Sequence, residues 1–280
     1  MIMKLCVNYL MELRELFDEG KINYVDYIKL FSIDADLSPF DWCISKRDVM
    51  FHGIVGKFSN IGDLDFMENR DFELQKDYFA RGKTPYVSAH ICREEDDPRS
   101  EEEVLQTIID NVKQLKELFG MKVILENVPA SRKRPKNHFM SNPEFITRVV
   151  EEADTGFLFD IGHARAAAEV LEIPFDEYVS RLPMHRLVEM HLAGCMLKLD
   201  GTISPNHSKM NEEDYEFVKM ALEKYSSIET VTLEYGPFVE QPLQEPCVIV
   251  SGDRVDSVAK AEVLEQLERL HEIMENYKNR

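Results

Sequence analysis

Acidic and histidine side chains stand at the ends of short apolar segments of this sequence. The segment Phe157-Leu158-Phe159 is followed at once by Asp160 and, three residues later, by His163. Alone, Asp160 could cap a helix that begins near Ala164, and His163 could be a hydrogen-bonded histidine at a strand end. Five further apolar segments end in the same way, at His52, His90, Glu126, His191 and Glu234. His207 follows the segment of His191.

Five of the eight histidines of the chain belong to this set, together with three carboxylates. Buried carboxylates and imidazoles are costly unless they are paired or bind a metal ion. A mixed nitrogen and oxygen donor set suits zinc, iron, manganese or cobalt, whereas calcium or magnesium would not need so many nitrogen ligands. One such residue is better explained as an ordinary hydrogen-bonded side chain, but the whole set predicts a metal site.

Segments rich in β-branched and apolar residues alternate with helical patterns, which is typical of βα units around a parallel sheet. The predicted strands cover 4–9, 24–31, 48–55, 86–91, 122–128, 156–161, 186–192 and 229–235. We therefore predict an α/β fold, a single (β/α)8 TIM barrel that occupies residues 1–280 as one domain. The carboxyl ends of its strands would bring the polar residues together at one face.

Three amphipathic helices are predicted at 101–119, 211–225 and 255–277. The connections 56–85 and 193–210 are long, and 236–253 is rich in proline and glycine. We expect these connections to cover one rim of the barrel.

The composition narrows the choice of partners. A formal net charge of −19 would repel a phosphate backbone, so nucleic acid is an unlikely partner.

The five cysteines are scattered and form no Cys-x-x-Cys pair, which argues against a disulfide framework and a zinc knuckle. We expect Cys92 and Cys195 to be small buried hydrophobic residues. There is no apolar run of about 18 residues and no recognisable signal peptide, so we expect no membrane association and a cytoplasmic location.

Positive charge gathers in residues 131–138, just after the predicted strand 122–128. The cationic side chains are Arg132, Lys133, Arg134 and Lys136. Such a run is usually a solvated surface, and the alternative is a substrate-binding loop for an acidic peptide, a carboxylate or a sugar phosphate. Arg165 could add to this loop, and Tyr235, beside Glu234, could stack on a substrate or simply pack.

Several short motifs follow one another along the chain. They are His52-Gly53, Ser88-Ala89-His90, Glu126-Asn127, Tyr178 with Leu182-Pro183, and His191-Leu192-Ala193-Gly194. This ordered set resembles the xylose isomerase-like TIM-barrel superfamily, which includes endonuclease IV. It is most similar to the branch of multinuclear non-haem iron-dependent oxidative enzymes, to which the methanobactin biosynthesis enzyme belongs. The similarity covers roughly residues 48–236, and the ordered set is more specific than any one motif.

The resemblance implies two or three divalent metal ions, with iron favoured and zinc or manganese as alternatives. It assigns one ion to His52, His90 and Glu126. It makes Glu126 a bridge to a second ion, which is held by Asp160, His191 and Glu234. His163 and His207 would serve a third ion, but the Asp expected two positions before His207 is Pro205 here.

We therefore predict a metal-dependent enzyme, a multinuclear non-haem iron oxidoreductase that modifies a peptide or a small thiol-containing substrate. Glu126 and Glu234 are the predicted catalytic carboxylates. One alternative is a divalent-metal sugar isomerase or epimerase, in which the same two carboxylates bind metal or act as bases. Further alternatives are an apurinic endonuclease-like phosphodiesterase and a non-catalytic metal-binding barrel.

Overall fold

Eight parallel strands form one sheet in the order β3-β2-β1-β10-β7-β6-β5-β4. The computed structural model describes residues 3–31, 38–54, 60–68, 70–94, 97–197, 203–236 and 256–279. The strands are β1 (Lys4–Asn8), β2 (Tyr27–Phe31), β3 (Asp48–His52), β4 (Tyr86–His90), β5 (Lys122–Glu126), β6 (Gly156–Asp160), β7 (Leu187–Leu192) and β10 (Thr230–Leu233). All eight predicted strands are present, with ends that differ by a few residues, and the predicted TIM barrel is confirmed.

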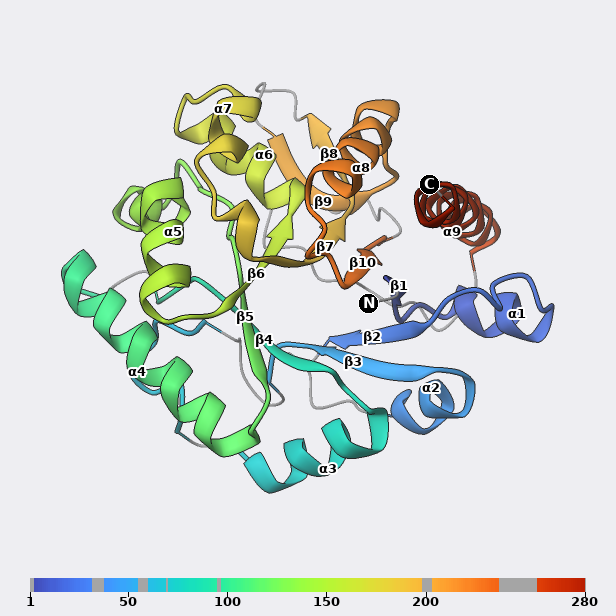
Figure 1. Ribbon diagram of the computed structural model, residues 1–280, viewed down its shortest axis with the longest axis horizontal. Coiled ribbons are helices and arrows are strands. Elements are labelled where there is room, and N and C mark those ends of the chain that lie inside the picture. The colour runs from blue at the N-terminus through green and yellow to red at the C-terminus, as the bar shows by residue number, and fades with distance from the viewer. Residues whose placement is uncertain are drawn as a thin grey trace.

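Helices surround this sheet on its outer side (Figure 1). They are α1 (Glu12–Asp18), α2 (Phe40–Lys46), α3 (Phe72–Gly82), α4 (Glu101–Phe119), α5 (Pro143–Glu152), α6 (Ile161–Val170), α7 (Phe175–Ser180), α8 (Glu212–Lys224) and α9 (Ser257–Lys278). The predicted helices 101–119, 211–225 and 255–277 correspond to α4, α8 and α9. The limits of α4 follow from its sequence, because Ser100 and Glu103 form a capping box and Gly120 ends the helix with φ 63°. None of the described helices is long and apolar enough to cross a membrane.

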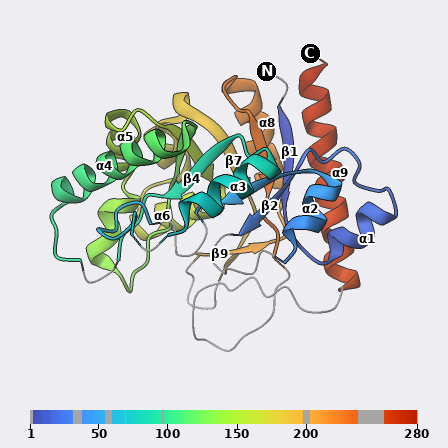
Figure 2. The same ribbon diagram turned by 90° about the horizontal axis from the view of Figure 1, so that it is seen from below.

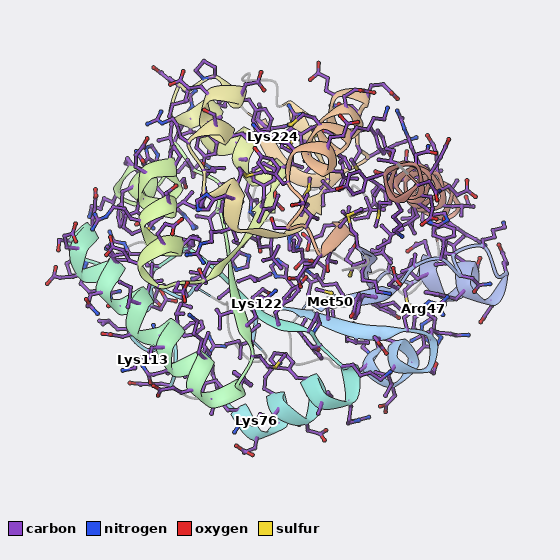
Figure 3. All side chains as sticks on the ribbon, viewed as in Figure 1. Arg47, Met50, Lys76, Lys113, Lys122 and Lys224 are labelled. Carbon is purple, nitrogen blue, oxygen red and sulfur yellow. The ribbon has the colours of Figure 1, made fainter. Side chains whose placement is uncertain are left out.

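Apolar side chains fill both sides of the sheet. A small cluster is made of Cys6, Met50, Tyr86, Ile124, Leu158 and Val188, contributed by six different strands. Figure 3 shows Met50 among the strands, whereas Lys76 and Lys113 lie on the outer helices α3 and α4. Successive side chains of a strand point to opposite faces, so each strand supplies residues both to the barrel interior and to the helices.

The barrel is nearly closed, because side chains join the two strands at the ends of the sheet order. The Thr84 hydroxyl donates to the Val49 carbonyl at 2.8 Å, and the Gly53 N–H donates to the Ser88 hydroxyl at 3.1 Å. This seam between β3 and β4 brings their carboxyl ends together. The imidazole rings of His52 and His90 consequently lie 4.8 Å apart, measured between ring centroids.

The two long connections 56–85 and 193–210 contain regular structure. The connection 56–85 includes α3, and 193–210 contains an antiparallel hairpin of β8 (Gly194–Leu197) and β9 (Ile203–Ser208). The hairpin depends on Gly194, where a Cβ atom would collide with the Lys209 carbonyl. Figure 2 shows β9 at the end of the barrel opposite the N-terminus. Of the predicted rim segment 236–253, only Gly236 lies within the described residues.

Candidate metal centre

The eight predicted metal ligands lie at the carboxyl ends of the barrel strands, in the first turn of α6 (His163) or in the hairpin (His207). Five of them are buried, namely His52, Glu126, Asp160, His191 and Glu234. The other three, His90, His163 and His207, are partly exposed. Residues that lie far apart in the sequence therefore meet at one face.

Glu126 lies at the centre of this set. Its Oε2 atom is 3.2 Å from Nε2 of His52 and 3.6 Å from Nε2 of His90. Its Oε1 atom is 3.3 Å from Nδ1 of His163 and 3.6 Å from Nδ1 of His191. Each of the two oxygens of this carboxylate thus faces two imidazoles, so that Glu126 faces four in all.

Two further carboxylates face imidazoles of this site, and one of them also faces His207. Glu234 lies 3.2 Å from Nδ1 of His191 and 3.7 Å from Nδ1 of His207. Asp160 lies 4.0 Å from Nδ1 of His191 and 3.9 Å from Nδ1 of His163. Three groups bring their ligand atoms within 4.8 Å of one another: His52 with Glu126 and His191, Glu126 with Asp160 and His163, and Asp160 with His191 and Glu234.

The donor atoms themselves fit a metal ion. The buried atoms that have no hydrogen-bond partner in the described part of the chain include four on predicted ligands: Glu126 Oε1, His191 Nδ1, His207 Nδ1 and Glu234 Oε1. Buried polar atoms are almost always hydrogen-bonded, so four orphans at one site need an explanation. Divalent ions of the zinc and iron type would satisfy this set of imidazole nitrogens and carboxylate oxygens.

The backbone around two ligands is held by asparagine side chains. The Asn127 amide donates to the Asp160 carbonyl at 3.0 Å and accepts from the Asp160 N–H at 2.8 Å. Asn8 makes the same pair of bonds to the backbone of Tyr235, which follows Glu234. These bonds fix the ends of β6 and β10, and with them the two carboxylates.

Asp160 also caps a helix, so the two sequence interpretations of this residue are compatible. Its Oδ1 atom accepts from the His163 N–H at 2.6 Å. The helix, α6, begins at Ile161 and not near Ala164, because Asp160 is the last residue of β6 and the chain turns directly into the helix. His207 reaches the site from β9 with φ 54°, a conformation that residues other than glycine rarely adopt.

Burial and neighbouring charges shift the pKa values of the ligands in opposite directions. Burial lowers the pKa of His90 to about 4, so its imidazole is neutral at pH 7. For His163 burial opposes the charge, but Asp160 and Glu126 outweigh it and raise the pKa to about 9. Glu234 and Glu126 likewise raise the pKa of His191 to about 10 against the effect of burial. Without metal, these two imidazoles remain protonated and balance part of the carboxylate charge.

A second polar layer lies below the ligands, and sequence reasoning missed it. Lys29 on β2 forms an ion pair with Glu189 on β7, with 2.5 Å between Nζ and Oε1. Burial opposes the charge of both groups, yet Glu189 raises the pKa of Lys29, and Lys29 and His191 lower that of Glu189. The available signal was the period of two within each strand, because Glu189 precedes His191 by two residues.

The predicted substrate-binding residues have different surroundings. Lys133, Arg134 and Lys136 are exposed, and Arg132 pairs with Glu169 at 2.5 Å. Arg165 and Tyr235 hydrogen-bond to carboxylates outside the set of predicted metal ligands. Arg165 donates to Asp214 at 2.8 Å, and the Tyr235 hydroxyl donates to Glu262 on α9 at 2.5 Å.

Cys92 and Cys195 are only partly buried, not fully buried as expected, and both are held as thiols. Burial raises the pKa of Cys92 to about 11 and that of Cys195 to about 12. Cys247 lies outside the described residues.

Comparison with known proteins agrees with this architecture. A family model described as "RiPP precursor modification enzyme MbnB/TglH/ChrH" matches residues 35–236, which are 202 of the 280 residues. A UPF0276 protein of Anaeromyxobacter sp. (strain Fw109-5) is 28% identical over 160 residues, which cover 53% of this chain and 55% of that protein. A UPF0276 protein of Rhizobium meliloti is 32% identical over 90 residues, covering 32% and 29%. The chain thus spans about half, or less, of these curated relatives.

Solved structures show the same fold at low sequence identity. A xylose isomerase domain containing protein from Salmonella typhimurium LT2 has a TM-score of 0.64 and 14% identity, with 98% of each chain covered. Endonuclease IV from Thermus thermophilus has a TM-score of 0.55 and 12% identity, with 96% of this chain and 99% of that chain covered.

The fold and the buried donor set define a xylose isomerase-like TIM barrel with a candidate metal centre. Within that class, the chain belongs to the MbnB/TglH/ChrH family of RiPP precursor modification enzymes. The family and the buried histidine and carboxylate clusters support a metal-dependent enzyme.

The protonated imidazoles predict how stability depends on pH. The folded-state pKa values of His163 and His191 lie above the ordinary value of 6.5. Their contribution is therefore complete below pH 6.5 and is lost as the pH rises through about 9 and about 10. We expect the melting temperature of the chelator-treated protein to fall by on the order of 5 °C between pH 6.5 and pH 9.

Metal-loaded protein should show a flatter profile, because bound ions replace these protons. The substitution His163→Gln should reduce the pH dependence of the chelator-treated protein. His185→Gln, at an exposed histidine paired with Glu151, should leave it unchanged. Identical profiles for wild type and His163→Gln would contradict the assignment.

Proposed function

We propose that the chain is a multinuclear non-haem iron oxidoreductase that modifies a peptide or a small thiol-containing substrate. The observation that carries this proposal is the position of Glu126, because each of its two oxygens faces two imidazoles. A carboxylate shared in this way can bridge two ions. We infer two ions, with a third at His163 and His207 weakened because Pro205 stands where a carboxylate ligand was expected.

The protein residues supply position and a dry environment for this chemistry. Bound iron would supply the redox change and a site for O₂. Glu126 and Glu234 carry negative charge into a buried site, because His90 and His191 hold the pKa of Glu126 low and His191 does the same for Glu234, against burial in both cases. The neutral imidazole of His90 is ready to donate a lone pair.

A peptide substrate is supported by the family description and by the charge of one loop. Lys133 and Lys136 are exposed on the segment that follows β5, in a chain whose net charge is −19. We infer that this loop contacts an acidic part of the substrate. Nucleic acid remains an unlikely partner because of the overall charge, and the cytoplasmic location and lack of membrane association remain predictions.

Two other activities share the fold but have less support. A sugar isomerase or epimerase and an apurinic endonuclease-like phosphodiesterase would both use divalent metal without a change in oxidation state. Similarity to the xylose isomerase domain protein and to endonuclease IV shows the fold alone. The identity of the bound metal and its response to O₂ separate these activities from the oxidative one.

The oxidative proposal predicts iron that responds to O₂. Protein purified without oxygen should contain roughly two irons per chain, and its Mössbauer spectrum should change when O₂ is added. Glu126→Gln should lose at least about half of this iron, since it removes the shared ligand. His271→Gln, at a histidine that stacks on Tyr24, is the control and should keep it. Zinc or manganese that is indifferent to O₂ would contradict the proposal.

The substrate loop gives a separate prediction. Lys133→Ala with Lys136→Ala should raise KM for an acidic peptide by roughly tenfold and leave kcat and metal content unchanged, because both lysines lie outside the donor set. Lys113→Ala, on the outer face of α4, is the matched control (Figure 3). An equal KM for the loop variant and the control would show that the loop is only a solvated surface.

A further inference from the structure

A buried ion pair lies directly beneath one metal ligand. Side chains two residues apart in a strand point to the same face, so Glu189 lies below His191 and Thr232 below Glu234. Lys29 reaches the same layer from β2. The side chains of Lys29 and Glu189 are 0% exposed, so bulk water does not solvate either charge.

These groups surround one edge of the His191 ring. Oε1 of Glu189 accepts from Nζ of Lys29 at 2.5 Å and from the Thr232 hydroxyl at 2.5 Å. The Nε2 atom of His191 is 3.3 Å from this oxygen and 2.5 Å from Nζ of Lys29. The opposite nitrogen, Nδ1, faces Glu234 and Glu126. The imidazole is therefore fixed from below, while its upper nitrogen points into the ligand set.

Stability alone does not explain such a pair. Taking two charges out of water costs several kcal/mol per ion, and replacing a buried pair with apolar residues of similar size is often neutral or stabilising. The interior of this barrel already contains a well-packed apolar layer, which includes Cys6 and Met50. A charged pair at this depth therefore points to a role at the site above it.

We propose that Glu189 and Lys29 are positioning residues that orient His191 for metal binding. Nζ of Lys29 and Oε1 of Glu189 hold the ring at its Nε2 edge, so that Nδ1 faces Glu234 and Glu126, and Lys29 with Thr232 holds the carboxylate in place. Carboxylates commonly orient metal-binding histidines in this way. The inference rests on the metal-binding part of the proposed function and is independent of iron and of oxidation.

The test replaces the pair by methionines and measures metal affinity. The double variant Lys29→Met, Glu189→Met should fold and melt at or above the wild-type temperature, because it removes two buried charges. Its affinity for Co²⁺, measured in competition with a chelator, should nevertheless fall by roughly 10- to 100-fold. Glu189→Gln, which keeps the shape of the side chain, should lower the Co²⁺ affinity by a similar factor. If the double variant does not fold, this single variant provides the test.

Tyr178→Phe is the control for a general loss of buried polar contacts. It removes the hydrogen bond from the buried Tyr178 hydroxyl on α7 to the Ser141 carbonyl, and it should lower the melting temperature without changing Co²⁺ affinity. If the double variant and Glu189→Gln bind Co²⁺ as tightly as wild type, the pair has no positioning role. If wild type binds no Co²⁺, Zn²⁺ or Fe²⁺, the proposed function itself fails.

Discussion

The burial of three carboxylates at one end of a barrel is the constraint on which the rest of the site depends. Glu126, Asp160 and Glu234 are each at most 2% exposed. Uncompensated, such charges would take up protons or open the structure to water. Imidazoles surround them instead, and two of these are protonated in the absence of metal because the carboxylates favour their charge.

The fold meets this constraint through the geometry of parallel strands. Every strand delivers its last inward-facing residue to the same end of the barrel, which places the ligands within a few ångströms without any local sequence motif. Asn8 and Asn127 then hold the neighbouring strand ends, because the side-chain amide of each makes a pair of hydrogen bonds to the backbone there. The seam between β3 and β4 is closed by Thr84 and Ser88, so that His52 and His90 meet. The contacts that close the barrel therefore also bring these two ligands together.

Much of this arrangement could be predicted from the sequence. The alternation of strands and helices gave all eight strands, and polar residues at their ends indicated which side chains would meet. The hairpin of β8 and β9 was missed, because its strands are short and the fit of Gly194 against Lys209 is a tertiary contact. Lys29 and Glu189 were missed because each resembles a surface charge until the partner strand is known. Arg165 and Tyr235 were predicted from their proximity in sequence to His163 and Glu234, and their roles in substrate binding stay predictions; in the structure they donate to Asp214 and Glu262.

We propose that two metal ions share the carboxylate of Glu126. The most direct test is anomalous X-ray diffraction from crystals of the metal-loaded protein, recorded at the absorption edge of the bound metal. Two peaks, each about 2.0–2.3 Å from an oxygen of Glu126, are the predicted result. A single peak, or two peaks of which only one contacts Glu126, would show that Glu126 does not bridge two ions.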